Sequence, residues 1–231
     1  MGYDWLTFDC YGTLIDWEAG IRASLEKLVL EKKPGVDPAT LPARYITTEL
    51  AVEAEGYRPY REVLRISVER LLKATGISLT RDEASVLVRT LPTWQPFPDV
   101  RKTLSRLGER YRLAILSNID EDLIAQSVKV LRVRFDAVIT AEQVRSFKPA
   151  PAHWRRMLEV CGTSVDRVLH VAASLEHDAR PAKRLGFDCV WVDRHGSGEP
   201  GDVRPDHIFR DLNPLESLLL GGGRPESAPT E

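Results

Sequence analysis

The 231-residue sequence has few cysteines, no long apolar run and almost no net charge. Its three cysteines, Cys10, Cys161 and Cys189, are too few and too widely spaced for a disulfide framework or a zinc site, which favours reduced thiols in a cytoplasmic protein. Apolar runs such as residues 113–116 are far shorter than a membrane span. A formal net charge of -2 gives no reason to expect a nucleic-acid or membrane partner. The N-terminus shows no basic-then-apolar leader, which argues against secretion.

Short apolar runs recur along the chain, and each is followed by a turn or a polar residue. They cover residues 3–9, 111–118, 135–141, 167–174 and 187–193. Helical patterns lie between them, over residues 99–110, 121–132 and 151–162. Consecutive apolar positions are typical of strands that are covered on both faces. The alternation therefore predicts an α/β fold, in which a Rossmann-like parallel sheet carries helices on both faces.

One long region interrupts this alternation. Between Asp16 and Trp94 no strand pattern stands out, and helical patterns cover residues 17–32, 41–56, 58–76 and 80–91. We therefore expect a helical cap domain inserted after the first strand. The expected division is an α/β core over 1–15 and 96–220, a helical cap over 16–95 and a disordered tail over 221–231, the last because it is rich in Gly, Pro and Ser.

Polar residues follow several of the predicted strands. In an open parallel sheet the functional site lies beyond the carboxyl ends of the strands. The residues expected there are Asp9 to Thr13, Ser117 and Asn118, and Ser174 to Asp178, with Lys148 just before a helix. Because the cap would leave from the same edge, it could cover them.

Four short motifs, in this order, resemble the haloacid dehalogenase-like hydrolase superfamily. They are "FDCYGTL" with Asp9, "ILSN" ending at Asn118, "FKP" with Lys148, and "HVAASLEHDARPAKRLGF" with Asp178. The resemblance implies that Asp9 is the nucleophile. Lys148 would keep it ionised, since an opposite charge within about 4–6 Å lowers a carboxylate pKa. Asp178 would orient Lys148 and serve as base toward the attacking water.

The second residue after Asp9 separates subgroups of this superfamily. The phosphatases carry an acid there, which protonates the leaving alcohol, whereas this sequence has Tyr11, as in the type II L-2-haloacid dehalogenases. A halide needs no proton to leave. The resemblance therefore implies a hydrolase that turns short 2-haloalkanoic acids into 2-hydroxy acids through a covalent ester of Asp9. It also implies that the enzyme needs no metal or other cofactor and forms a homodimer.

Polar residues near the strand ends have supporting roles in this interpretation. Thr13 would hydrogen-bond Asp9 and hold its oxygen in attack geometry. Ser117 and Asn118 offer hydroxyl, amide and backbone donors, which suit a substrate carboxylate. Ser174 stands where the dehalogenases have Asn, and it would support the lysine or position water.

Two further residues are placed by the resemblance. Arg44, with Glu49 five residues later on the same predicted helix, resembles the arginine with which the dehalogenases hold the departing halide. A cation there would stabilise charge that develops in the transition state. Trp154 stands six residues after Lys148, where the dehalogenases have Tyr, and would form the pocket wall with Tyr11.

Several alternatives remain open from the sequence. A magnesium-dependent phosphatase of the same superfamily would use Asp9 and Asp178 to hold the metal. A catalytically idle protein would instead bind a partner through its cap. His177 is a second candidate for the base that activates water, although a histidine beside a helix start is more often a cap or a surface residue. Cys10 lacks a recognisable histidine partner, and we interpret it as a small buried residue.

Overall fold

The computed structural model describes residues 2–33 and 35–221 of the chain, and in this part six strands form one parallel sheet. They are β1 (Trp5–Phe8), β2 (Arg112–Ser117), β3 (Ala137–Thr140), β4 (Val168–Ala172), β5 (Asp188–Val192) and β6 (His207–Phe209). Their order across the sheet is β3-β2-β1-β4-β5-β6. The order reverses direction between β1 and β4, and in such sheets the crevice beyond the strand ends at that point is the usual binding site.

Helices cover both faces of the sheet, as predicted. The helices that surround the sheet are α6 (Val100–Leu107), α7 (Glu121–Leu131), α8 (Ala141–Val144), α9 (Ala152–Cys161), α10 (Arg180–Arg184) and α11 (Asn213–Leu220). Alternate residues of β1 point to opposite faces. Leu6 joins a buried cluster with Leu104 of α6, while its neighbour Trp5 joins a second cluster with Met157 of α9. Burial on both faces explains why these strands read as continuous apolar runs.

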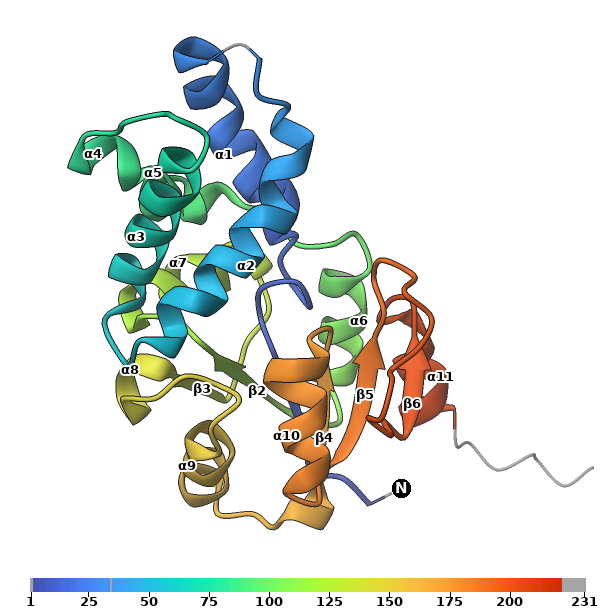
Figure 1. Ribbon diagram of the computed structural model, residues 1–231. Coiled ribbons are helices and arrows are strands. Elements are labelled where there is room, and N and C mark those ends of the chain that lie inside the picture. Colours follow the sequence, from blue (N-terminus) through green and yellow to red (C-terminus); the bar gives the residue numbers. More distant parts are fainter. Residues whose placement is uncertain (1, 34, 222–231) are drawn as a thin grey trace, which may run out of the picture.

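The described residues between β1 and α6 form helices and turns but no strand. The main helices are α1 (Trp17–Lys32), α2 (Leu41–Ala54), α3 (Tyr60–Lys73), α4 (Arg81–Ala84) and α5 (Val86–Thr90). Two short 3-10 turns, η1 (Pro38–Thr40) and η2 (Leu91–Thr93), complete the segment. Figure 1 shows these helices grouped together beyond the end of the sheet to which the strand arrows point. The cap expected from the sequence is therefore present after the first strand.

The two chain segments that connect the helical region to the sheet run side by side. The Asp16 N–H donates to the carbonyl of Gln95 at 2.9 Å, and the Phe97 N–H donates to the carbonyl of Leu14 at 3.0 Å. We propose that this paired crossing marks the boundary between a core (1–15 and 96–220) and a cap (16–95). The Asp120 carboxylate of the core also caps α3, because it accepts hydrogen bonds from the Tyr60 N–H at 2.6 Å and the Arg61 N–H at 2.9 Å.

Some elements differ from the sequence prediction. The helix expected over 80–91 is two short helices, α4 and α5, separated at Ser85. Strand β6 and helix α11 were not predicted. Strand β6 has only three residues, and none of them is fully buried. The tail expected over 221–231 lies, beyond Gly221, outside the described residues. None of the helices in the described ranges is long and apolar enough to cross a membrane.

Candidate active site

Asp9 lies directly after β1, in a tight turn that fixes its carboxylate. The turn needs Gly12, whose φ of 91° lies in the region that favours glycine. The Thr13 hydroxyl donates to Asp9 Oδ2 at 2.8 Å and accepts from the Ala173 N–H, beyond β4, at 2.9 Å. Thr13 therefore joins the loops after two neighbouring strands and holds the carboxylate between them.

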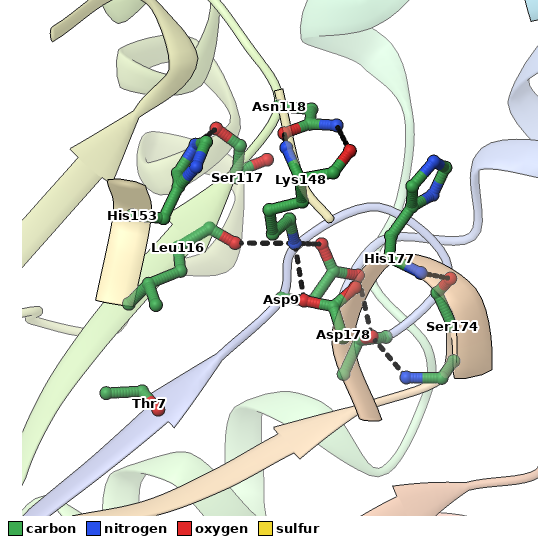
Figure 2. Close-up of polar contacts among 12 residues, drawn as sticks. Thr7, Asp9, Leu116, Ser117, Asn118, Lys148, His153, Ser174, His177 and Asp178 are labelled. Atoms are coloured by element: carbon green, nitrogen blue, oxygen red, sulfur yellow. Dashed lines mark hydrogen bonds and ion pairs between the residues drawn. The ribbon is translucent and has the colours of Figure 1, made fainter. Parts of the chain in front are cut away.

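Lys148 is the centre of the polar network. Its ammonium donates to Asp9 Oδ1 at 2.8 Å, to Asp178 Oδ1 at 2.6 Å and to the carbonyl of Leu116 at 3.0 Å. Figure 2 shows these three contacts converging on one nitrogen. An ammonium has three donors. All three are used within the protein, and only 2% of the side chain is exposed.

These three charged groups change one another's pKa. Burial raises the pKa of Asp9, and the ammonium of Lys148 acts against that rise. Burial by itself would also raise the pKa of Asp178, but Lys148 and the hydrogen bond from His170 lower it to about 2. For Lys148, burial favours the neutral amine, but Asp178 and Asp9 more than reverse this and raise its pKa well above the usual range. The lysine therefore stays cationic at any pH at which the protein would work.

A buried histidine that the sequence did not single out supports Asp178. His170 of β4 has its Nε2 3.2 Å from Asp178 Oδ1 and its Nδ1 2.9 Å from the Thr7 hydroxyl of β1. Because an ionised carboxylate only accepts, Nε2 is the donor in the contact with Asp178. A histidine within the apolar run "VLHVA" was the available signal, since such a residue needs polar partners inside the sheet.

Ser117 and Asn118 lie at the end of β2, beside Lys148. The Asn118 side chain is engaged with the backbone of Lys148, accepting from its N–H at 2.7 Å and donating to its carbonyl at 3.2 Å. This pairing positions the lysine loop and limits what the amide can offer a substrate. The Ser117 carbonyl lies 3.2 Å from Nε2 of the buried His153. Burial lowers the pKa of His153 to about 3, which makes the imidazole neutral.

Asp178 lies in a single π-helical turn, η4 (Leu175–Ala179), that follows β4. The Ser174 hydroxyl caps this turn by accepting from the His177 N–H at 3.0 Å. Ser174 therefore shapes the loop of Asp178 and does not contact Lys148. Asp178 Oδ2 is buried and has no hydrogen-bond partner among the described residues. Within those residues, no group of three or more His, Cys, Asp or Glu side chains is arranged to hold a metal ion.

A cavity of about 250 Å³ lies between the sheet edge and the cap. Its lining includes seven residues expected at the site, namely Asp9, Tyr11, Ser117, Asn118, Lys148, Ser174 and Asp178, together with His177. The hydroxyl of Tyr11 is hydrogen-bonded to the Ser127 hydroxyl at 2.8 Å, and its ring packs edge-on against Trp94. Tyr11 therefore presents its ring to the cavity and directs its polar atom to α7.

The cap contributes acids to the cavity that the sequence analysis did not assign. Helix α2 lines it with Ile46, Glu49, Leu50 and Glu53, which recur with helical spacing on one face. Glu49 Oε1 accepts from the Tyr45 hydroxyl at 3.1 Å and the Tyr60 hydroxyl at 2.6 Å. Nothing in the α2 sequence distinguishes these glutamates from solvent-facing ones before the helix is docked on the core.

The placement expected for Arg44 is wrong in this structure. Arg44 is exposed and does not line the cavity. A helix turns about 100° per residue, so Arg44, two positions before Ile46, points roughly 200° away from the face that lines the cavity. The residue that the sequence matched to the halide-holding arginine therefore lies on the outer side of α2.

Trp154 also has a different place from the one expected. It is 1% exposed, lies on α9 and packs edge-on against His170 with ring centroids 5.6 Å apart. It belongs to the buried cluster on the face of the sheet that α9 covers and does not line the cavity. Its indole packs beneath the site on this face of the sheet and does not form a wall of the cavity.

Known proteins resemble this chain in sequence and in fold. A family model described as haloacid dehalogenase-like hydrolase matches residues 3–186. The chain is 28% identical over 231 residues to the (S)-2-haloacid dehalogenase H-109 of Pseudomonas putida, covering 93% of this chain and 97% of that relative. It is 24% identical over 184 residues to the phosphoglycolate phosphatase of Aquifex aeolicus, covering 78% and 80%.

A solved structure extends the likeness to the whole fold. The L-2-haloacid dehalogenase of Xanthobacter autotrophicus superposes with a TM-score of 0.82 at 23% sequence identity, covering 96% of this chain and 100% of that chain. The match of the family over most of the chain, together with the Asp9, Lys148 and Asp178 network at the sheet edge, gives one conclusion: this chain belongs to the haloacid dehalogenase-like hydrolase family.

Proposed function

We propose that the protein cleaves the carbon–halide bond of short 2-haloalkanoic acids through a covalent ester of Asp9. The observation that carries the proposal is the pairing of a fixed Asp9 carboxylate with Tyr11 two residues later. The Tyr11 hydroxyl is bonded to Ser127, and the pKa of this buried phenol is raised well above its usual range. It is therefore a poor proton donor for a leaving alkoxide, whereas a halide needs none. The names of the haloacid dehalogenase relatives agree with this choice.

In the first step an Asp9 oxygen attacks the carbon that bears the halogen. A C–O bond forms, the C–X bond breaks, and the halide leaves with the bonding electrons. Lys148 and Thr13 each hold one oxygen of the carboxylate, at 2.8 Å in both cases. This fixes the carboxylate before substrate arrives, so little orientational freedom is lost in the transition state.

In the second step water attacks the carbonyl carbon of the Asp9 ester. A base takes a proton from the water, the acyl C–O bond breaks, and the base returns the proton to the departing alkoxide oxygen, so that the 2-hydroxy acid leaves with its oxygen derived from Asp9. Asp178 supports this step by holding Lys148, whose charge stabilises the anionic intermediate. His177 lines the same cavity, and burial lowers its pKa, so its imidazole is neutral and can accept the proton.

Isotope labelling tests the mechanism directly. In a single turnover of 2-chloropropionate in H₂¹⁸O, we expect chloride release and one ¹⁸O incorporated into the peptide that contains Asp9, measured by mass spectrometry. Asp9→Asn should abolish chloride release while keeping the far-UV circular dichroism of the parent. If the label appears only in lactate, water attacks the substrate directly. If no haloacid reacts and p-nitrophenyl phosphate is hydrolysed only with Mg²⁺, the protein is a phosphatase.

Two finer expectations belong to the same proposal, namely that the enzyme acts in the cytoplasm and works as a homodimer. The three cysteines are free thiols, and Cys10 and Cys189 are buried, which suits a reducing compartment. Light scattering coupled to size-exclusion chromatography would give about twice the chain mass of 26.0 kDa for the dimer.

A further inference from the structure

Among the lysines and arginines of the described residues, only Lys148 lines the cavity where the anionic end of a haloacid would bind. Lys148 already uses its three donors on Asp9, Asp178 and the Leu116 carbonyl. The described lining contains no arginine and no second lysine, and Arg44 points away from it. Anionic substrates are normally bound by charged or strong neutral donors. The substrate carboxylate is therefore left to neutral donors, such as the Ser117 hydroxyl and the backbone groups beside it, and a further neutral donor from the cap would strengthen its binding.

Glu53 of α2 is placed to supply one. Its side chain is 8% exposed and lines the cavity opposite the sheet edge. Its nearest polar partners are distant for hydrogen bonds, with Asn118 Nδ2 at 3.4 Å from Oε1 and His177 Nε2 at 3.5 Å from Oε2. A buried carboxylate with such weak partners is poorly stabilised as an anion.

The neighbouring Glu49 decides which of the two acids keeps a proton. Glu49 accepts two tyrosine hydroxyls, which stabilise its anion, whereas Glu53 has no short hydrogen bond. Burial raises the pKa of Glu49 to about 7. Burial, and then the charge of Glu49, raise that of Glu53 to about 8, although Asn118 and Lys148 act in the opposite direction. Glu53 therefore keeps its proton at neutral pH.

We propose that Glu53 binds the substrate as a neutral carboxylic acid, whose hydroxyl donates a hydrogen bond to the substrate carboxylate. This inference rests on the proposed haloacid specificity and assigns part of the recognition of the substrate carboxylate to the cap. The titratable groups near Glu53 are Glu49 and Tyr45 on its own helix, Tyr60 on α3, Lys148, and His177 on η4, and the amide of Asn118 lies beside it. Once Glu53 ionises, two cap carboxylates face an anionic substrate, and binding is opposed by like charge.

The test compares an anionic substrate with a neutral isostere. The value of kcat/KM is measured from pH 6 to 10 for 2-chloropropionate and 2-chloropropionamide. With the parent enzyme we expect the value for the acid to fall about tenfold per pH unit above about pH 8, and the value for the amide to stay level. Glu53→Gln keeps a donor that does not ionise and should remove this fall. Glu49→Gln should move it to lower pH, because the neighbouring charge is gone.

Glu55→Gln is the matched control, because Glu55 is an exposed acid just after α2 that pairs with Arg58 and Arg70. Its profile should match that of the parent. The inference is overturned if the fall persists in Glu53→Gln, if the parent profile for the acid is flat, or if the amide falls equally. In each of these cases the halide release itself would still support the proposed function.

A binding measurement keeps the two proposals separate. If neither substrate releases chloride, the proposed function is wrong, and calorimetry with lactate and lactamide still tests Glu53. Lactate should bind the parent roughly thirtyfold more weakly at pH 9.5 than at pH 7, since only a few per cent of Glu53 stays protonated. Lactamide and the Glu53→Gln variant should show no such change. Equal lactate affinity at the two pH values in the parent would refute the role of Glu53.

Discussion

Replacing Lys148 by methionine removes the cation that separates two buried carboxylates. The ammonium lies 2.8 Å from Asp9 and 2.6 Å from Asp178, and both carboxylates are nearly inaccessible to water. Methionine keeps most of the side-chain volume, so the change isolates the charge. We expect the variant to fold. Near neutral pH its unfolding free energy should be lower than that of the parent, and most of its activity should be lost.

The magnitude follows from the geometry. A unit charge at 2.8 Å interacts with another by about 6 kcal/mol at an effective dielectric of about 20, before desolvation is subtracted. Removing one partner of a buried ion pair costs about 3–5 kcal/mol in practice. If the whole of this free energy appears as a shift in the pKa of Asp9, that pKa rises by roughly 2–4 units. The acid limb of kcat/KM should move upward by that amount, because the nucleophile must be ionised to attack.

The sign of the pH dependence distinguishes this effect from a loss of packing. In the parent, the pKa of Asp178 is lowered to about 2, so its contribution to stability is present above about pH 4 and is lost as the pH falls toward 2. In Lys148→Met the two carboxyls have pKa values above those of the unfolded chain, so their ionisation opposes folding above about pH 4. The difference in unfolding free energy should therefore be largest near pH 8 and shrink toward pH 4.

Urea unfolding at pH 8 and pH 4.5 measures this difference, and a pH profile of chloride release measures the shift at Asp9. The exposed Lys102 provides the control, and Lys102→Met should change the unfolding free energy by less than about 0.5 kcal/mol. A loss in Lys148→Met below about 1 kcal/mol at pH 8, or a loss of the same size at both pH values, would refute the charge argument.

Two other substitutions separate the site from its surroundings. Arg44→Gln should keep kcat/KM for 2-chloropropionate within about twofold of the parent, because the guanidinium lies outside the cavity; a hundredfold loss would show that α2 rotates during turnover. Trp154→Ala should reduce the unfolding free energy measured in urea by about 3–5 kcal/mol, because it leaves a cavity at a fully buried site beneath the sheet. A change in KM without a loss of stability would show that Trp154 lines the substrate pocket.

The sequence predicted the structure best for strands that are buried on both faces of the sheet. Strands covered on both faces must be apolar at consecutive positions, and the five longer strands were predicted on that basis. The helix at Ala152–Cys161 ends at Gly162, whose φ of 57° lies in the region that favours glycine. Strand β6 was not predicted because it has only three residues, none of them buried, and these carry no pattern that separates a strand from a loop.

The fixed residues of the network could also be located from the sequence, because parallel strands bring their carboxyl ends to one edge. Asp9 and Asp178 follow the ends of β1 and β4, and Lys148 lies in the segment between α8 and α9. Their partners His170 and Thr7 lie inside neighbouring strands, and their contact depends on the pairing Thr7↔His170 of β1 with β4. Register is a tertiary property, which the local sequence does not specify.

By itself, the sequence determined the alternation of strands and helices, the helical insertion and the carboxylate at the end of the first strand, because each depends on local pattern and chain direction. Only the tertiary structure decided which side of α2 meets the cavity. Apolar residues lie on two faces of that helix, since Tyr45 and Val52 pack inside the cap while Ile46 and Leu50 line the cavity. With no single apolar stripe, the rotation of α2 is fixed by docking on the core, and that rotation turns Glu53 toward the site and Arg44 toward solvent.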